Sequence, residues 1–287
     1  MPPSQTGFLE VKPDQVNSYN PDFKGVPTVR IGVVDTGVDT GSVVLHPFLW
    51  INTDLDNKCP GYSFSRHGLD LSDQSSPHPM DRQGHGSHVG GIAAGLSPNL
   101  SFSLPDVRLE LITAKVSKNA RNTMDLFTAT CGIHYALDQG ADVINLSWGY
   151  LDSLVTVKDK EGNDKKVLRP PLVMLGALEE ARDKGVVIVA ALGNDGQKLG
   201  DGMKFWPASF AETWDNVIAV GASTDAGGMK LFEFFNHYGG DILALARNCQ
   251  CNPVIWHIHR RAPAIWSKSL CPEDGPWVPE LPCLLHS

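Results

Sequence analysis

The segment DRQGHGSHVGG, residues 81–91, places His85 and His88 three positions apart among glycines. The imidazole has an unperturbed pKa near neutral, so a histidine can accept a proton, donate one or bind a metal ion. A carboxylate beside one ring nitrogen fixes the tautomer and stabilises the protonated ring, which makes the other nitrogen a general base. The chemistry of this segment therefore depends on the polar groups that lie near it.

Two other polar residues follow apolar runs that predict buried strands. Asp35 comes directly after VRIGVV, and Asn194 follows GVVIVAAL and a glycine. An aspartate at a strand end can orient a histidine, and an asparagine amide can donate a hydrogen bond to an oxyanion. Asn194 also fits a plain turn residue, because GNDG is a good turn sequence.

Five apolar runs predict strands, and three segments with helical spacing lie among them. The predicted strands are VRIGVV (29–34), LELITAKV (109–116), DVINLS (142–147), GVVIVAAL (185–192) and NVIAVGAS (216–223). The predicted helices are HVGGIAAGL from His88, TMDLFTATCGIHYALDQG up to Gly140, and LVMLGALEEARDKG up to Gly185. Strands that alternate with helices predict an α/β fold with a mostly parallel sheet and helices on both faces. Ligands bind beyond the carboxyl ends of such strands.

Three further segments differ from this pattern. Residues 150–170 are rich in charge around EGND and predict a solvated hairpin. Residues 41–80 mix Pro, Ser, Asp and Asn and predict a long surface loop. Residues 247–287 hold four of the six cysteines and show no apolar periodicity, which predicts an irregular tail unrelated to the rest.

Charge and hydropathy exclude several classes of protein. The chain has 287 residues, a net charge of −8 and no run of lysine and arginine longer than two, so nucleic-acid binding is not expected. No apolar run approaches the ~20 residues of a membrane helix. No basic segment followed by an apolar one marks a secretory signal after Met1, which leaves the compartment open. We expect a monomer that binds neither nucleic acid nor a membrane.

Several motifs together resemble the subtilisin-like serine proteases. VVDTGVD resembles the catalytic aspartate motif of that family, GHGSHVGGIAAG its histidine motif with Ser87 where threonine is usual, and VAALGNDG its oxyanion motif. ADVINLSWG resembles the strand that pairs with the substrate backbone. WPASFAETWDNVIAVGAS resembles the Pro-Ala segment, here Pro207 and Ala208, with the strand that follows it. The resemblance begins near residue 25, and it predicts one peptidase domain over residues 1–246.

This resemblance implies a three-layer subtilisin-like fold and a serine endopeptidase that acts on polypeptides. It implies that Asp35 orients the imidazole, that His85 is the general base and that Asn194 binds the oxyanion. The substrate-binding residues that it implies are Ser147, Trp148, Gly149 and Gly193. The segment 147–149 can alternatively be read as no more than a strand end. Family members often bind calcium, but the sequence shows no calcium site and no other cofactor site.

The remaining histidines and cysteines have simpler interpretations than metal binding. His88 lies one turn along the helix from His85 and is interpreted as a structural hydrogen-bonding residue, because His-x-x-His without a nearby Glu is poor zinc spacing. A zinc set can also be written in the tail, from Cys249, Cys251, His257 and His259. A shifted reading frame, a retained intron or an alternative exon is the simpler explanation for those residues.

The nucleophile motif of the family, Gly-Thr-Ser-Met-Ala, does not occur in the sequence. In subtilisin about 66 residues separate the oxyanion asparagine from the serine, so counting from Asn194 leads to about residue 260. Ser267 and Ser269 lie near that point but lack the glycine and the small residues of the motif. We therefore expect a domain without its C-terminal elements that shows little or no proteolysis. The alternatives are a non-catalytic peptide-binding protein and a truncated product that does not fold.

Overall fold

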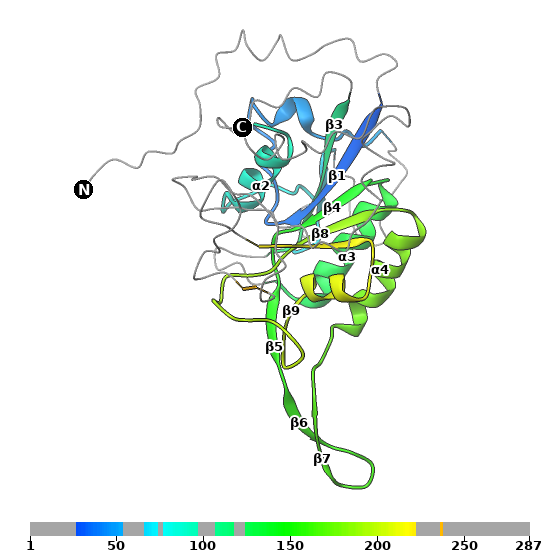
Figure 1. Cartoon of the computed structure of the whole chain (residues 1–287). Coiled ribbons are helices and arrows are strands. Elements are labelled where there is room, and N and C mark those ends of the chain that lie inside the picture. Colours follow the sequence, from blue (N-terminus) through cyan, green and yellow to red (C-terminus); the bar gives the residue numbers. More distant parts are fainter. Residues whose placement is uncertain are drawn as a thin grey trace, which may run out of the picture. The chain divides into compact units, whose positions relative to one another are not determined.

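The computed structural model describes residues 27–53, 66–73, 77–96, 107–117, 124–221 and 236–237. The chain divides between Ala141 and Asp142 into two compact units, and each is described by itself. Figure 1 labels the helices and strands in chain order. The predicted tail, the zinc set within it and the expected loss of C-terminal elements lie outside the described residues.

The described part of the first unit contains three parallel strands in the order β2-β3-β1. Their bounds are Thr28–Asp35 for β1, Gly68–Asp70 for β2 and Arg108–Lys115 for β3. β1 and β3 form because their apolar side chains are buried on both faces of the sheet, which favours branched residues. Val34, Leu111 and Ile112 are all fully buried. Burying each such side chain stabilises the fold by about 1.5–3 kcal/mol.

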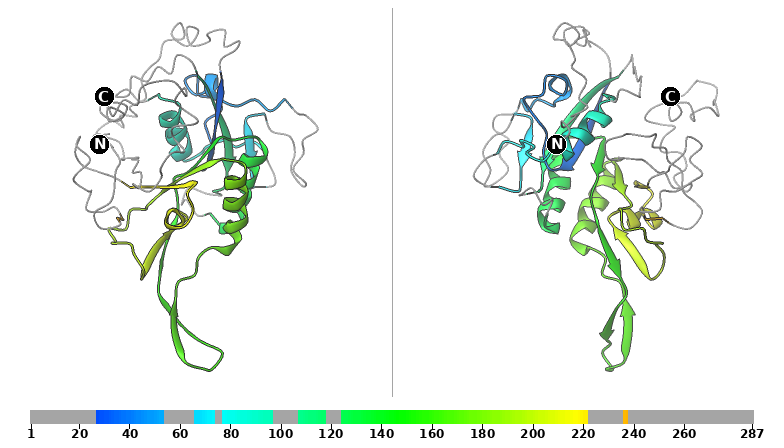
Figure 2. Two further views of the ribbon diagram at one scale, coloured as in Figure 1. Left: turned by 45° about the vertical axis from the view of Figure 1, so that its right-hand side comes forward. Right: turned by 90° about the vertical axis from the view of Figure 1, so that its left-hand side faces the viewer.

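Helices α2 (His85–Ala93) and α3 (Leu126–Asp138) cover opposite faces of these strands. A Cβ at Gly132 of α3 would lie 3.5 Å from Cβ of Ala114, and one at Gly90 of α2 would lie 3.4 Å from Cδ1 of Leu111. Ala114 and Leu111 are three positions apart on β3, and successive side chains of a strand alternate between faces. Asp35 pairs with Lys115 and so shares the face of Leu111, which is the face that α2 covers. Figure 2 shows these elements from two further sides.

The described part of the second unit repeats this architecture with strands in the order β4-β8-β10, again all parallel. Their bounds are Val143–Leu146 for β4, Val187–Ala191 for β8 and Val217–Val220 for β10. Helix α4 (Leu172–Asp183) packs against β8. Parallel strands with helices packed on them in both units confirm the predicted α/β fold, and all five predicted strands and all three predicted helices form.

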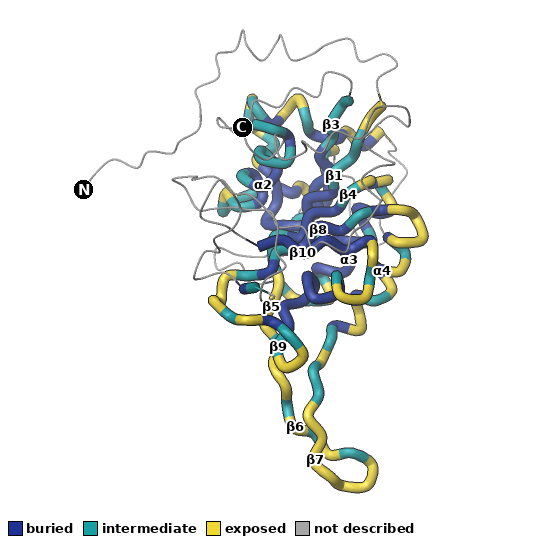
Figure 3. Tube along the Cα trace, in the orientation of Figure 1, coloured by how far each residue is buried: buried dark blue, intermediate teal, exposed yellow. Residues whose placement is uncertain are grey.

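The described part of the second unit also contains two antiparallel pairs of strands. β5 (Tyr150–Ser153) pairs with β9 (Met203–Trp206), and β6 (Val155–Lys158) pairs with β7 (Asp164–Val167) in a hairpin. The β6–β7 hairpin has no buried residue, and most of its residues are solvent-exposed (Figure 3). The expected solvated hairpin within residues 150–170 is therefore confirmed. Two short 3-10 helices, η1 (His46–Phe48) and η2 (Ala208–Glu212), lie in the first and second unit.

Two predictions were wrong in detail. Residues 41–80 are not a continuous surface loop, because Gly68–Asp70 form β2 along β3, and Leu45 and Leu49 are buried. One apolar residue in a three-residue strand leaves no periodicity to recognise in the sequence. Helix α2 begins at His85 and not at His88, since a carboxylate upstream accepts the first backbone amides of the helix. No helix within the described ranges is long and apolar enough to cross a membrane.

Candidate active site

Asp35 and His85 form a hydrogen-bonded pair in the first unit. Asp35 is the last residue of β1, is 2% exposed, and its Oδ1 lies 2.7 Å from Nδ1 of His85. The same oxygen accepts a hydrogen bond from the backbone amide of Thr36 at 2.7 Å. A carboxylate only accepts hydrogen bonds, so Nδ1 of His85 is the donor. This tautomer leaves Nε2 of His85 to accept a proton.

The surroundings of His85 favour its protonated form. The hydrogen bond to Asp35 raises the pKa of His85 above its ordinary value of 6.5, although burial works in the opposite direction. The negative charges of Asp35 and Asp81 add to the rise. The imidazole side chain is 38% exposed, so the ring is held by the protein on one side and still reaches solvent. The neutral ring can therefore take a proton at Nε2 from an approaching hydroxyl group, and the raised pKa stabilises the protonated ring that results.

A glycine allows α2 to begin directly against the end of β1. A Cβ at Gly86 would lie 2.1 Å from the carbonyl oxygen of Gly37 and 3.2 Å from Cβ of Asp35. Any side chain at this position would push the first turn of the helix away from the strand. The glycines of the GHGSHVGG segment therefore contribute to the geometry of the pair as well as to the turn before it.

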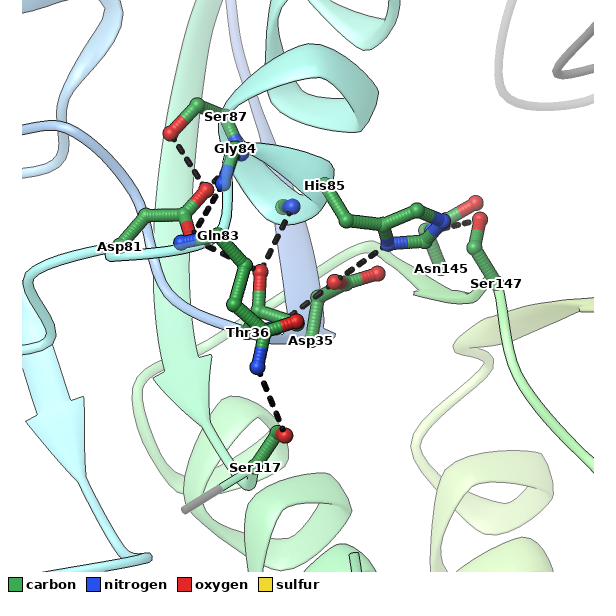
Figure 4. A network of polar contacts seen from close by, with 11 residues as sticks. Asp35, Thr36, Asp81, Gln83, Gly84, His85, Ser87, Ser117, Asn145 and Ser147 are labelled. Carbon is green, nitrogen blue, oxygen red and sulfur yellow. Dashed lines mark hydrogen bonds and ion pairs between the residues drawn. The ribbon is translucent and has the colours of Figure 1, made fainter. Parts of the chain in front are cut away.

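Asp81 collects five hydrogen bonds around the pair (Figure 4). Its Oδ1 accepts from the amides of Gln83 and Gly84, each at 2.9 Å, and from the hydroxyl of Thr36 at 3.0 Å. Its Oδ2 accepts from the amide and the hydroxyl of Ser87 at 2.9 and 2.7 Å. The carboxylate thus connects the residue after Asp35 with the residues on both sides of His85.

These hydrogen bonds determine the charge state of Asp81. Burial by itself would raise the pKa of the Asp81 carboxyl, but the hydroxyl of Ser87 and the backbone amides of Gln83, Ser87 and Gly84 hold that pKa below its ordinary value. The hydroxyl of Thr36 donates to Asp81 and accepts from the amide of Gly86 at 2.9 Å. The carboxylate and the hydroxyl together form the N-terminal cap of α2, which Gly84 cannot supply with a side chain.

His88 lies in the same helix as His85, and its pKa shifts in the opposite direction. Burial lowers its pKa below 6.5, and the charge of His85 lowers it further. The described ranges contain no group of three or more His, Cys, Asp or Glu side chains that could hold a metal ion. The structural interpretation of His88 remains a prediction.

The predicted substrate-binding residues Ser147, Trp148 and Gly149 connect β4 with β5 in the second unit. Asn145 is 2% exposed, and its Nδ2 donates to Oγ of Ser147 at 2.9 Å. Ser147 and Trp148 are half-buried, and Gly149 is exposed. Asn145 therefore holds the first residue of the segment that follows β4, and all three residues of the segment remain at least partly accessible to solvent.

Gly193 and Asn194 lie in the loop after β8, and Asn194 is exposed. Asn236 fixes this loop and is itself only 1% exposed. Its Oδ1 accepts from the amides of Asp195 and Gln197 at 3.2 and 2.9 Å. Its Nδ2 donates to the carbonyl of Leu192 at 2.7 Å and to Oδ2 of Asp195 at 2.9 Å, and its amide donates to the carbonyl of Gly193 at 3.0 Å.

The structure brings Asp35 and His85 together as the sequence predicts, and it places the other predicted residues at the ends of β4 and β8. Sequence reasoning did not identify Asp81 or Asn236 as supporting residues. Asp81 opens the very segment that suggested a histidine site, so its position four residues before His85 was a usable signal. Asn236 gave no comparable signal, because its partners lie about 40 residues away along the chain.

Comparison with known proteins gives consistent matches. A family model for the subtilase family, Peptidase S8, matches residues 27–258. The thermophilic serine proteinase of Bacillus sp. (strain AK1) is 36% identical over 204 residues, which are 69% of this chain and 39% of that protein. Thermitase of Thermoactinomyces vulgaris is 33% identical over 214 residues, which are 73% of this chain and 59% of that protein. The chain thus spans less than two thirds of the length of either relative.

A solved structure shows the same fold. The nisin leader peptidase NisP from Lactococcus lactis matches with a TM-score of 0.51 and 21% sequence identity, over 79% of this chain and 63% of that chain. At this level of identity the likeness concerns the fold. It agrees with the parallel strands and packed helices that each unit contains.

Proposed function

The chain belongs to the subtilase family of serine proteases, and from this premise we propose that it is a subtilisin-like endopeptidase domain built for polypeptide substrates. His85 is the general base, Asp35 orients its imidazole, and Asn194 is the donor for the oxyanion. The observation that carries this proposal is the 2.7 Å hydrogen bond between Nδ1 of His85 and Oδ1 of Asp35, because the acid-base function of the family depends on this pair.

The proposed roles follow from the chemistry of acyl transfer. Nε2 of His85 takes the proton of a serine hydroxyl as its oxygen attacks the scissile carbonyl. Asp35 keeps Nδ1 protonated and stabilises the positive charge that the ring acquires. The side-chain amide of Asn194 donates a hydrogen bond to the negative oxygen of the tetrahedral intermediate; losing such a donor costs subtilisin about 2.7–4 kcal/mol.

We further propose that this chain lacks the nucleophile and hydrolyses peptides slowly or not at all. In this family the serine follows the oxyanion asparagine. After Asn194 the matched range contains only Ser209 and Ser223, and neither lies in a Gly-Thr-Ser motif. Ser209 is 3% exposed, and its Oγ accepts a hydrogen bond from the amide of Phe205. Removing the serine of subtilisin slows its reaction about 10⁶-fold, and we expect a loss of that order here.

Labelling with a fluorophosphonate probe tests the absence of a nucleophile. The purified chain and its His85→Ala variant are incubated with the probe and with casein, beside an active subtilase as positive control. We expect labelling and casein cleavage only in the positive control. Labelling of the chain that disappears in His85→Ala would contradict the proposal, because it would reveal a serine that His85 activates.

A peptide-binding protein without hydrolysis is the second candidate function. The half-buried Ser147 and Trp148 and the exposed Gly149 and Asn194 favour it, since these proposed contacts do not depend on a nucleophile. Saturable binding of an unstructured peptide that stays intact would support this function. A broad, non-cooperative thermal transition would instead favour a product that does not fold.

Residues 247–287 are proposed to be unrelated to the peptidase domain, although the match to the family model continues as far as residue 258. The transcript beyond the codon for Ala246 tests this directly. A Gly-Thr-Ser motif in another reading frame would support a change of frame or of exon. A continuous reading frame in independent transcripts would support a genuine isoform.

A further inference from the structure

The ring of Phe205 lies between two of the proposed substrate-binding glycines. A Cβ at Gly149 would lie 2.2 Å from Cε1 of Phe205, and a Cβ at Gly193 would lie 2.2 Å from Cε2 and 2.4 Å from Cζ. Opposite edges of the same ring therefore touch the backbone after β4 and the backbone after β8. Both distances are far below any real Cβ contact, so the ring occupies the space that side chains at these positions would need.

The backbone on both sides of Phe205 fixes the ring in this place. Phe205 pairs with Leu151 across β5 and β9, and its amide donates to Oγ of Ser209 at 2.9 Å. A Cβ at Gly149 would also lie 2.5 Å from the carbonyl oxygen of Trp206. Phe205 is 6% exposed. The ring cannot turn aside without disturbing either the strand pair or the glycine segments.

We infer that Phe205 closes the subsite between Gly149 and Gly193, so that a bound polypeptide carries a small side chain, Gly, Ala or Ser, at the position facing these residues. This inference rests on the proposed function, because it requires that the segments at 147–149 and 193–194 bind a polypeptide. Phe205 is a specificity-determining residue in this account. Its ring fills the volume that a large aliphatic or aromatic side chain of the substrate would need.

Peptide binding provides the test and needs no catalysis. Positional-scanning pools of fluorescein-labelled octapeptides, each with one position fixed as Ala, Val, Leu or Phe, are titrated with the intact chain by fluorescence polarisation. We expect one position at which the Ala pool binds at least tenfold more tightly than the Leu and Phe pools. The variant Phe205→Ala, which leaves a cavity of about the size of benzene, should then bind the Leu or Phe pool at least tenfold more tightly than the intact chain does.

Two further variants make the result specific. Phe210→Ala is the matched control, because Phe210 is 4% exposed and packs on Trp206 at a centroid distance of 4.5 Å, whereas the ring beside both glycines is that of Phe205. It should keep the preference for the Ala pool. Phe205→Leu removes less volume and should tolerate Val at the same position, so it serves if Phe205→Ala does not fold.

The experiment distinguishes a failure of the inference about Phe205 from a failure of the proposed peptide-binding function. If the Ala, Leu and Phe pools bind the intact chain equally well at every position, the inference about Phe205 is overturned and peptide binding survives. If Phe205→Ala and Phe205→Leu fold but keep the original preference, the inference is likewise overturned. If no pool binds any folded variant, the proposed peptide-binding function fails and the inference fails with it.

Discussion

Asp81 in the first unit and Asn236 in the second each hold a segment that carries predicted site residues, but they do so with different chemistry. Asp81 accepts five hydrogen bonds from the start of α2 and from Thr36. Asn236 accepts two hydrogen bonds through its side chain, donates two more, and holds the loop that carries Asn194. One side chain is charged and half-buried, and the other is neutral and fully buried.

A carboxylate holds one segment and an amide the other because the two segments present different backbone groups that need hydrogen-bond partners. The first turn of a helix presents several amides without intrahelical partners, and a carboxylate can accept several of them at once. The loop after β8 presents amides and a carbonyl together, and only a group that both donates and accepts can satisfy both. The carboxylate also contributes charge, which helps to raise the pKa of His85, whereas the amide contributes geometry alone.

The largest effect is expected from Asp81→Ala. Five donors lose a charged acceptor, and α2 loses its N-terminal cap, so the free energy of unfolding should fall by about 3 kcal/mol. Urea denaturation measures this change. Asp81→Asn is the matched control, because it keeps one acceptor oxygen and should lose clearly less stability. Equal losses in the two variants would show that the number of hydrogen bonds accepted does not matter.

A smaller and more local effect is expected from Asn236→Ala. The amides of Asp195 and Gln197 and the carbonyl of Leu192 lose their buried partner, which should lower the free energy of unfolding by about 2 kcal/mol. Hydrogen exchange of the Asp195 and Gln197 amides should accelerate. The amide of Ser87 should exchange at an unchanged rate, and it should accelerate only in Asp81→Ala. Loss of protection in both units in either variant would mean that the two segments are not held independently.

The charge on His85 should appear in the pH dependence of stability. Its folded-state pKa is raised by Asp35, so its contribution to stability is fully present below pH 6.5 and is lost as the pH rises through the folded-state value. His85→Gln should remove this contribution, so that the difference in unfolding free energy between the two proteins shrinks with rising pH. His67, whose pKa is lowered by burial, remains in both proteins and cancels in the comparison. The pKa of His88 should rise in His85→Gln, because the charge of His85 contributes to lowering it.

The smallest change in stability is expected in the β6–β7 hairpin, where the polar contacts are solvent-exposed, in contrast to those of Asp81 and Asn236. Lys158 and Asp164 form an ion pair there with side chains 67% and 66% exposed. Solvent screens such a pair, so Lys158→Ala should change the free energy of unfolding by less than about 0.5 kcal/mol. A change above 1 kcal/mol in urea denaturation would show that the hairpin is held by more than the contacts described.

The sequence predicts those parts of the fold and the site that local patterns encode. The runs around Val34, Leu111 and Ile188 form buried strands, and Asp35 and His85 meet as their motifs suggest. Very short strands, and hydrogen bonds between residues far apart in the sequence, leave no such local pattern. β2 has one apolar residue, and the partners of Asp81 and Asn236 include residues 45 and 41 positions away along the chain. The position of Phe205 depends on the packing of three chain segments, none of which carries a signal for it.

The most direct test of the central claim is the pKa of His85, measured from the titration of its ring proton by NMR in the intact chain and in Asp35→Asn. We expect a value above 6.5 in the intact chain and a clearly lower one in the variant, because the hydrogen bond to the Asp35 carboxylate and its charge raise the pKa and burial lowers it. His67, whose pKa is lowered by burial and by the charges of His46 and Arg66, provides an internal reference in the same spectra. A His85 pKa that stays the same in Asp35→Asn would contradict the assignment of this pair as the acid-base centre.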